Sequence, residues 1–309
     1  MKKILVFILM LAAVSALCPV LAEDAGDGLD IVVTDFPCYD FARAVAGDND
    51  RVTMLIKPGA EVHSFDPTPA DVAAMMEADV FIYIGGESDV WAEEMLSAMD
   101  GGPAVLRMFD CVEAVETEFI EGMEHERGDG HDHAEYDEHI WTSPKNAALM
   151  VQAVADVLSE CDPAAAQTYA ANAQAYIGEI NAVDERIQGI VDSAERKELV
   201  FGDRFPFLYL ARQYGLEYYA AFPGCAAETE PSARTLMFLI DHVISEKLPA
   251  VYRIEMSTGV IADTIARETG AEVLTLHSMQ NVTADEFAAG ETYVTLMNKN
   301  AEALEKGLN

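Results

Sequence analysis

Short apolar runs alternate with longer amphipathic stretches along most of the chain. In the first half, four runs of strand length are separated by turns and helical patterns, at residues 30–36, 51–56, 79–84 and 104–109. In the second half, four similar runs occur at residues 198–201, 217–221, 250–254 and 272–276. Strands that alternate with helices are typical of parallel sheets. We therefore predict an α/β fold with two parallel-sheet lobes and flanking helices.

A long helical pattern separates the two sets of strands. Asp162-Pro163 opens it, and it continues to about residue 194 with apolar positions alternating at intervals of four and three. About 30 helical residues span about 45 Å, which exceeds the width of a small domain. An ordinary core helix is the alternative. Because a second α/β pattern begins directly after it, we favour a single long helix that bridges two lobes.

The N-terminus has the pattern of an export signal. Lys2-Lys3 precede an apolar run, and Val20-Leu21-Ala22 offers a small-residue cleavage site before Glu23. A lipid anchor at Cys18 is the alternative, although Leu17 fits a lipobox poorly. The predicted organisation is a signal peptide, a first lobe, connecting helices and a second lobe. The signal peptide covers residues 1–22, the first lobe 23–150, the connecting helices 151–197 and the second lobe 198–309. We expect an exported protein, periplasmic or at the cell surface and either free or membrane-tethered.

The net charge of the chain limits the kinds of molecule that it could bind. The 309 residues contain 54 acidic and 19 basic side chains, for a net charge of −35. This excess argues against nucleic acid, whose phosphates need basic side chains, and favours cations. Four cysteines follow the predicted signal peptide without a C-x-x-C motif, and their spacing does not give a pairing. We expect a monomer.

Histidines mark the candidate chemistry. Four of the seven lie between residues 125 and 139, and the segment 125–133 combines histidines with glycines and acidic residues. We interpret this His-rich loop as a low-affinity metal collector; an acidic surface loop is the alternative. His63, His139 and His277 lie at predicted ends of elements in both halves of the chain. Neutral imidazole is a common zinc ligand, so a shared metal site is a hypothesis at this point.

Several motifs together resemble a known family. They are H-S-F-D-P-T-P at 63–69, D-E-H-I-W-T-S-P at 137–144, L-A-R-Q-Y-G-L at 210–216, E-T-E-P-S-A at 228–233 and I-A-D-T-I-A-R-E-T-G-A at 261–271. The mature chain resembles the cluster A-I solute-binding proteins of zinc and manganese ABC transporters. The resemblance implies two lobes bridged by a long helix, a metal ion in the cleft between them, delivery to a membrane permease, and no enzymatic activity.

The resemblance also implies a ligand set. His63 and His139 match the two histidine ligands of the first lobe, and His277 stands where the family commonly has a carboxylate. At the remaining position this chain has Arg204, which cannot bind a metal ion because it is always cationic. Asp203 is the nearest substitute, and pairing with Arg204 is its alternative role. The predicted metal ligands are therefore His63, His139, His277 and Asp203.

Other interpretations stay open. Cys225, Glu228 or water could replace Asp203, and Glu255 could accept a hydrogen bond from an imidazole. Three imidazoles with at most one carboxylate suit Zn²⁺ as the transported ligand better than Mn²⁺, which prefers more oxygen. A zinc hydrolase with a three-histidine site is the alternative function. The chain has no H-E-x-x-H motif, and Glu138, beside His139, is the only loose candidate for the general base of such an enzyme.

Overall fold

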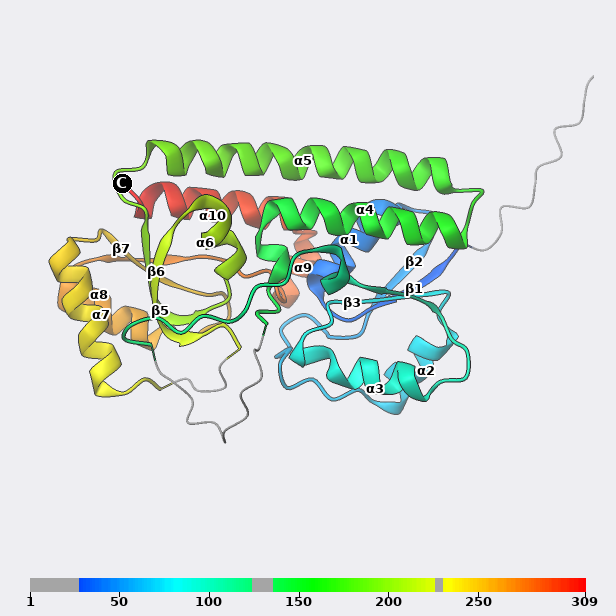
Figure 1. The fold of residues 1–309 in the computed structure, drawn as a ribbon, viewed down its shortest axis with the longest axis horizontal. Coiled ribbons are helices and arrows are strands. Elements are labelled where there is room, and N and C mark those ends of the chain that lie inside the picture. The colour runs from blue at the N-terminus through cyan, green and yellow to red at the C-terminus, as the bar shows by residue number, and fades with distance from the viewer. Residues whose placement is uncertain (1–27, 124–135, 226–229) are drawn as a thin grey trace, which may run out of the picture.

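Two four-stranded parallel sheets form the centres of two lobes (Figure 1). The computed structural model describes residues 28–123, 136–225 and 230–309. The first sheet has the order β2-β1-β3-β4, and the second has the order β6-β5-β7-β8. The strands are β1 (Asp30–Val33), β2 (Arg51–Met54), β3 (Val80–Tyr83), β4 (Ala104–Arg107), β5 (Glu198–Phe205), β6 (Glu217–Pro223), β7 (Ala250–Arg253) and β8 (Glu272–Thr275). The prediction of two parallel-sheet lobes is confirmed.

Helices cover both sheets, and local sequence signals start several of them. The first lobe contains α1 (Phe36–Ala46), α2 (Pro69–Glu77), α3 (Val90–Ala98) and α4 (Pro144–Cys161), with short 3-10 turns at Glu87–Asp89, Met108–Cys111 and Ile140–Thr142. The second lobe contains α6 (Leu208–Tyr214), α7 (Ala233–Glu246) and α8 (Val260–Thr269). The side chain of Thr68 caps α2 by accepting a hydrogen bond from Asp71 N, and Ser143 caps α4 in the same way. A proline follows each cap, as expected for a first helical turn.

The helix α5 (Ala166–Ser193) runs along both lobes (Figure 1). Its 28 residues correspond to about 42 Å. One stripe of the helix is buried, from Tyr169 through Tyr176 and Ile180 to Val191, and the helix packs against α1 and α4 of the first lobe and against the C-terminal helix. The predicted bridging helix is confirmed.

The chain crosses between the lobes a second time, which the sequence patterns did not predict. After β8, Asn281 Nδ2 donates hydrogen bonds to Lys57 O (2.9 Å) and Ala60 O (2.8 Å) in the first lobe. The short helix α9 (Ala284–Ala289) follows, and α10 (Tyr293–Gly307) returns beside α5 toward the second sheet (Figure 1). The last segment of the chain therefore contacts both lobes.

Strand β5 is longer than its apolar run predicted. The sequence pattern ended it at Phe201, but pairing with β6 resumes at Arg204 and Phe205 after an irregularity in the register. Gly202 lies in this irregular stretch, where an added Cβ would lie 2.6 Å from the backbone of Ala262 in α8. This extension places Asp203 and Arg204 at the carboxyl end of the second sheet, where parallel α/β sheets commonly bind ligands. Within the described ranges, no helix has both the length and the apolar character needed to cross a membrane.

Candidate metal site between the lobes

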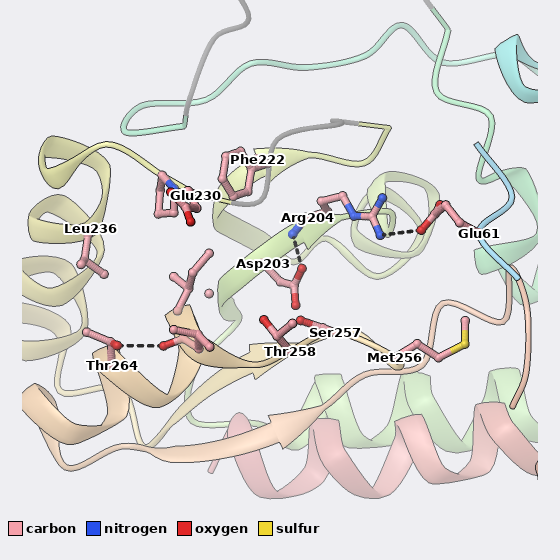
Figure 2. A pocket seen from close by; sticks show the side chains of 14 residues that line it. Glu61, Asp203, Arg204, Phe222, Glu230, Leu236, Met256, Ser257, Thr258 and Thr264 are labelled. Atoms are coloured by element: carbon pink, nitrogen blue, oxygen red, sulfur yellow. Dashed lines mark hydrogen bonds and ion pairs between the residues drawn. The ribbon is translucent and has the colours of Figure 1, made fainter. Parts of the chain in front are cut away.

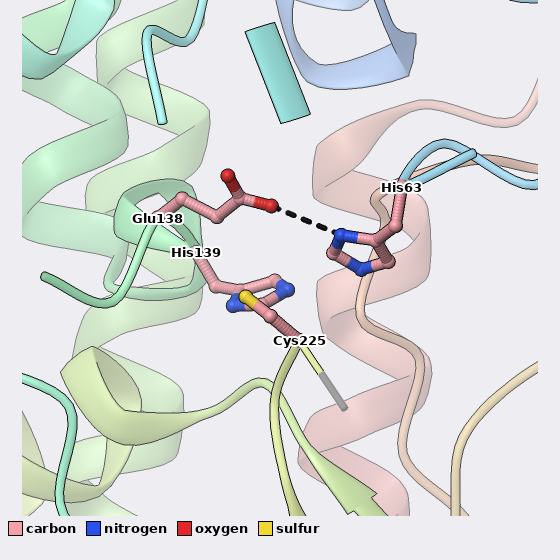
Figure 3. A group of neighbouring side chains, drawn as sticks. All are labelled: His63, Glu138, His139 and Cys225. Atoms are coloured by element: carbon pink, nitrogen blue, oxygen red, sulfur yellow. Dashed lines mark ion pairs between the residues drawn. The ribbon is translucent and has the colours of Figure 1, made fainter. Parts of the chain in front are cut away.

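Four potential metal-binding side chains from both lobes lie close together. They are His63, Glu138, His139 and Cys225, and one ligand atom of each lies within 4.8 Å of the others (Figure 3). His63 lies on the loop after β2, and Glu138 and His139 precede α4. Cys225 follows β6 in the second lobe. Among the described residues, no other cluster of histidine, cysteine and acidic side chains is this compact.

His63 is held in one tautomer by its neighbours. Its Nδ1 lies 2.8 Å from Ser88 Oγ and 3.2 Å from Glu138 Oε1. The hydroxyl of Ser88 donates its proton to Glu138 Oε1 at 2.5 Å, so Ser88 Oγ can only accept from the imidazole. The proton of neutral His63 therefore resides on Nδ1. As a result, the lone pair of Nε2 is available to a metal ion.

His139 presents the same nitrogen from a buried position. Its side chain is fully buried, and Nδ1 lies 3.1 Å from Asp137 Oδ1, which can only accept. Nε2 is buried and makes no hydrogen bond to the described residues. Burial lowers the pKa of His139, but the carboxylates of Asp137 and Glu138 outweigh burial and raise it overall. A buried nitrogen lone pair with no donor is unfavourable unless an ion or water occupies the adjacent space.

Glu138 positions His63 and adds negative charge to the site. Its Oε2 accepts a hydrogen bond from Ser88 N at 3.0 Å. Burial alone would raise the pKa of this carboxyl, but the hydrogen bond and charge of His63 and the charge of His139 lower it to about 2. A general base that works near neutral pH needs a pKa closer to 7. The hydrolase interpretation, which relied on Glu138 as its base, is therefore not favoured.

Gly224 brings the second lobe against His139. A Cβ at this position would lie 2.9 Å from His139 Cε1, 3.1 Å from its Nδ1 and 3.1 Å from the carbonyl oxygen of Phe205. Only a glycine fits between the imidazole and the β5 backbone without displacing one of them. Because Cys225 is the next residue, this close approach places its sulfur beside the His139 ring (Figure 3).

Asp203 and Arg204 lie outside this cluster. Together with Glu61, Ser257 and Thr258, they line a cavity of about 580 Å³ formed mostly by the second lobe (Figure 2). Asp203 Oδ1 accepts a hydrogen bond from Arg204 N at 2.9 Å, while Oδ2 is buried without a hydrogen bond to the described residues. The guanidinium of Arg204 lies 3.7 Å from Glu61 on the first-lobe loop. The predicted ligand Asp203 therefore borders the interlobe space without joining the compact group.

His277 is also separate from this group, and its imidazole is arranged differently. Nδ1 accepts a hydrogen bond from Met279 N at 2.9 Å, so the neutral ring carries its proton on Nε2, which lies 3.6 Å from Glu286 Oε1. Burial lowers the pKa of His277, but Glu255 and Glu286 raise it overall. Glu255, which was predicted to accept from an imidazole, lies 3.6 Å from Nδ1. His277 would have to give up the Met279 contact to bind a metal ion through Nε2 as a neutral ring.

The structure thus brings together two of the four predicted ligands, His63 and His139. Cys225, one of the alternatives for the uncertain position, lies with them. Glu138 was considered only as an enzymatic base, although its place beside His139 in D-E-H was a signal for this cluster. Glu228 and the His-rich loop 125–133 lie outside the described residues, so their predicted roles stay predictions.

Two α/β lobes that share a long helix, with imidazoles gathered between their facing loops, define a two-lobed solute-binding protein. The chain belongs to the family described as zinc-uptake complex component A, periplasmic (ZnuA), whose family model matches residues 31–307. This membership confirms the resemblance inferred from the motifs.

Known relatives agree with this assignment. The zinc-binding lipoprotein AdcA of Streptococcus pneumoniae (strain TIGR4) is 32% identical over 313 residues, which cover 99% of this chain and 61% of AdcA. The chain thus spans about three-fifths of that relative. The high-affinity zinc uptake system protein ZnuA of Bacillus subtilis is 30% identical over 291 residues, covering 93% of this chain and 90% of that protein. The crystal structure of the Zn(II)-bound ZnuA-like domain of AdcA superposes with a TM-score of 0.77 at 29% identity, covering 91% of this chain and 99% of that domain.

Proposed function

We propose that this protein is an exported receptor that captures Zn²⁺ between its lobes and delivers it to the membrane permease of an ABC importer. His63 and His139 bind the ion through Nε2, with the carboxylate of Glu138 beside them. The family membership and the zinc-binding relatives support this function. The N-terminal sequence supports export, with the signal peptide ending at residue 22.

One observation carries the proposal. Two imidazoles from different segments each keep Nδ1 directed at a hydroxyl or carboxylate and leave Nε2 as the available donor. Protein zinc sites commonly fix their histidines in this way, because the second hydrogen bond sets the tautomer and raises the basicity of the ligand nitrogen. For His139, burial without a hydrogen bond at Nε2 adds a further reason for an ion at this position.

The test is a calorimetric titration of the mature protein, from residue 23, with Zn²⁺ and Mn²⁺. We expect stoichiometric zinc binding that is lost in the double variant His63→Ala, His139→Ala and survives deletion of residues 125–133. The matched control is His242→Ala, because His242 pairs with Glu198 elsewhere in the second lobe. Binding that disappears with the loop and survives the double variant would refute the interlobe site.

Two further variants test the remaining predicted ligands. Asp203→Asn and His277→Gln each remove one candidate donor while keeping side-chain size. A loss of zinc affinity of about 100-fold or more would assign the residue to the ligand set, and unchanged affinity would remove it. A parallel assay for zinc-dependent hydrolysis of esters and peptides tests the alternative function; we expect no turnover.

A further inference from the structure

We propose that Cys225 supplies the second-lobe metal ligand and binds zinc as a thiolate. This inference rests on the proposed function, because it concerns the same interlobe site. It adds a ligand type, a soft sulfur donor, to the nitrogen and oxygen donors of the first lobe. It also explains how the ion contacts the second lobe although Arg204 and Asp203 point to a different cavity.

The backbone places Cys225 at the site by two constraints. Strand β6 pairs with β5 as far as Pro223, opposite Phe205. Gly224 then lies against the His139 ring, at a separation that leaves no room for a side chain. The following residue therefore emerges beside the imidazole, and its side chain is half-buried. This position is fixed by the end of a strand and a tight contact, so it does not depend on chance orientation of a loop.

The distances suit a tetrahedral zinc ion with little adjustment. Zinc binds sulfur at about 2.3 Å, and nitrogen or carboxylate oxygen at about 2.0–2.2 Å, so the ligands of a tetrahedral site lie about 3.3–3.8 Å apart. One ligand atom of each of the four residues already lies within 4.8 Å of the others without an ion. A contraction of about 1 Å in the widest of these separations reaches the tetrahedral range, and rotation about χ1 can move the Cys225 sulfur toward the other groups.

Charge balance favours a thiolate at this point. Two neutral imidazoles and the Glu138 carboxylate leave a net charge of +1 on a site with Zn²⁺, and Arg204 adds a fixed positive charge on the neighbouring strand. An ionised Cys225 brings the summed charge of the ion and these four side chains to zero, which reduces the electrostatic penalty of burial. On binding, the sulfur–zinc bond forms as the thiol proton is released to the buffer, and no oxidation state changes.

Cobalt(II) provides a direct test, because a thiolate ligand gives an intense sulfur-to-cobalt charge-transfer band in the near ultraviolet. We expect this band in the wild-type mature protein loaded with Co²⁺ and in Cys161→Ser, whose cysteine is exposed on α4. We expect its loss in Cys225→Ser. The same variant should lose about 100-fold or more in zinc affinity and keep its manganese affinity within about threefold, because manganese prefers oxygen to sulfur.

Alkylation provides a measurement that needs no variant. Iodoacetamide should modify Cys225 in the metal-free wild-type protein and leave it unmodified in the zinc-bound protein, as read by peptide mass spectrometry. Cys161 is the internal control and should react equally in both states. Equal reactivity of Cys225 with and without zinc would overturn the proposal.

The outcomes separate this inference from the proposed function. Tight zinc binding that requires His63 and His139 but gives no sulfur–cobalt band would overturn the thiolate ligand and leave the receptor function intact. Absence of zinc binding in the wild-type protein would overturn both. A band that persists in Cys225→Ser would also overturn the assignment, because another cysteine would then be the ligand.

Discussion

Replacement of Gly224 by alanine should weaken zinc binding through steric displacement, without changing any ligand. The new Cβ would lie 2.9 Å from His139 Cε1, while carbon atoms in contact normally lie about 3.5–4.0 Å apart. The ring or the loop must therefore move by about 0.6–1 Å. Movement of the loop away from the ring is opposed by the Phe205 carbonyl oxygen, at 3.1 Å from the same Cβ.

The expected magnitude follows from the precision that such sites require. Functional side chains must be held to within about 0.5 Å of their productive positions, so a larger shift of His139 should lower zinc affinity at least tenfold, or about 1.4 kcal/mol. Overpacking of this kind also lowers the free energy of unfolding by about 1–3 kcal/mol. Affinity is measured by competition with a chelating dye, and stability by urea unfolding of the metal-free protein.

Gly178→Ala is the matched control for this experiment. Gly178 lies within α5, and no atom outside its own helical turn lies within 4 Å of a Cβ built there. Alanine is the better helix former by up to about 1 kcal/mol, so this variant should be slightly more stable and bind zinc like the wild type. The steric reasoning would be refuted if Gly224→Ala lost stability but bound zinc with unchanged affinity.

Four further predictions concern the protonation of His139, the charge of Glu138 and the buried carboxylate of Asp40. The carboxylates around His139 raise its pKa above the ordinary value of 6.5, so protons compete with zinc for this imidazole near neutral pH. The apparent zinc affinity should therefore fall about tenfold for each unit that the pH is lowered and each proton displaced. Zinc titrations between about pH 5.5 and 8 measure this dependence. In the metal-free protein, the same raised pKa stabilises the fold below pH 6.5, and this contribution is lost as pH rises through the folded-state value; a flat stability profile across that window would contradict it. Glu138→Gln keeps the shape of the side chain but removes the charge that orients His63 through Ser88. This variant should lower zinc affinity about 10–100-fold, as measured by dye competition. Glu179→Gln, on the exposed face of α5, is the control and should leave zinc affinity unchanged. Asp40→Ala removes a buried carboxylate that accepts hydrogen bonds from Tyr293 N at 2.9 Å and from the hydroxyl of Tyr176. Urea unfolding of this variant should show a free energy of unfolding lower by about 3–5 kcal/mol. A loss below about 1 kcal/mol would show that this network contributes little to stability.

The strands and the bridging helix could be predicted from sequence because each depends on a local pattern. Buried parallel strands need continuous apolar runs, and a helix packed on one side needs apolar residues every three to four positions. All eight predicted runs became strands, and the stripe from Tyr169 to Ile187 is buried as its spacing required. The end of β5 was missed because Gly202-Asp203-Arg204 does not look like a strand, although pairing with β6 resumes beyond it.

The site was only partly predictable, because its assembly depends on distant contacts. His63 and His139 were identified from motifs that place them beside structural elements. The close approach of Cys225 to His139 depends on Gly224, which looks like an ordinary turn residue in the sequence. The tautomer of His277 depends on the backbone of Met279, which no residue pattern reveals. The directions of the hydrogen bonds therefore distinguish His63 and His139 from His277, which the spacing of the histidines in the sequence could not do.

The second crossing of the chain has a consequence for biogenesis. The loop that carries His63 is fastened by Asn281, and the buried carboxylate of Asp40 accepts from the amide of Tyr293, which lies 253 positions later. A chain that emerges from its N-terminus can form the first sheet early, but it cannot complete these contacts until residues 281–293 have also emerged. The interlobe site therefore matures late in vectorial folding, after the residues that fasten the His63 loop have emerged.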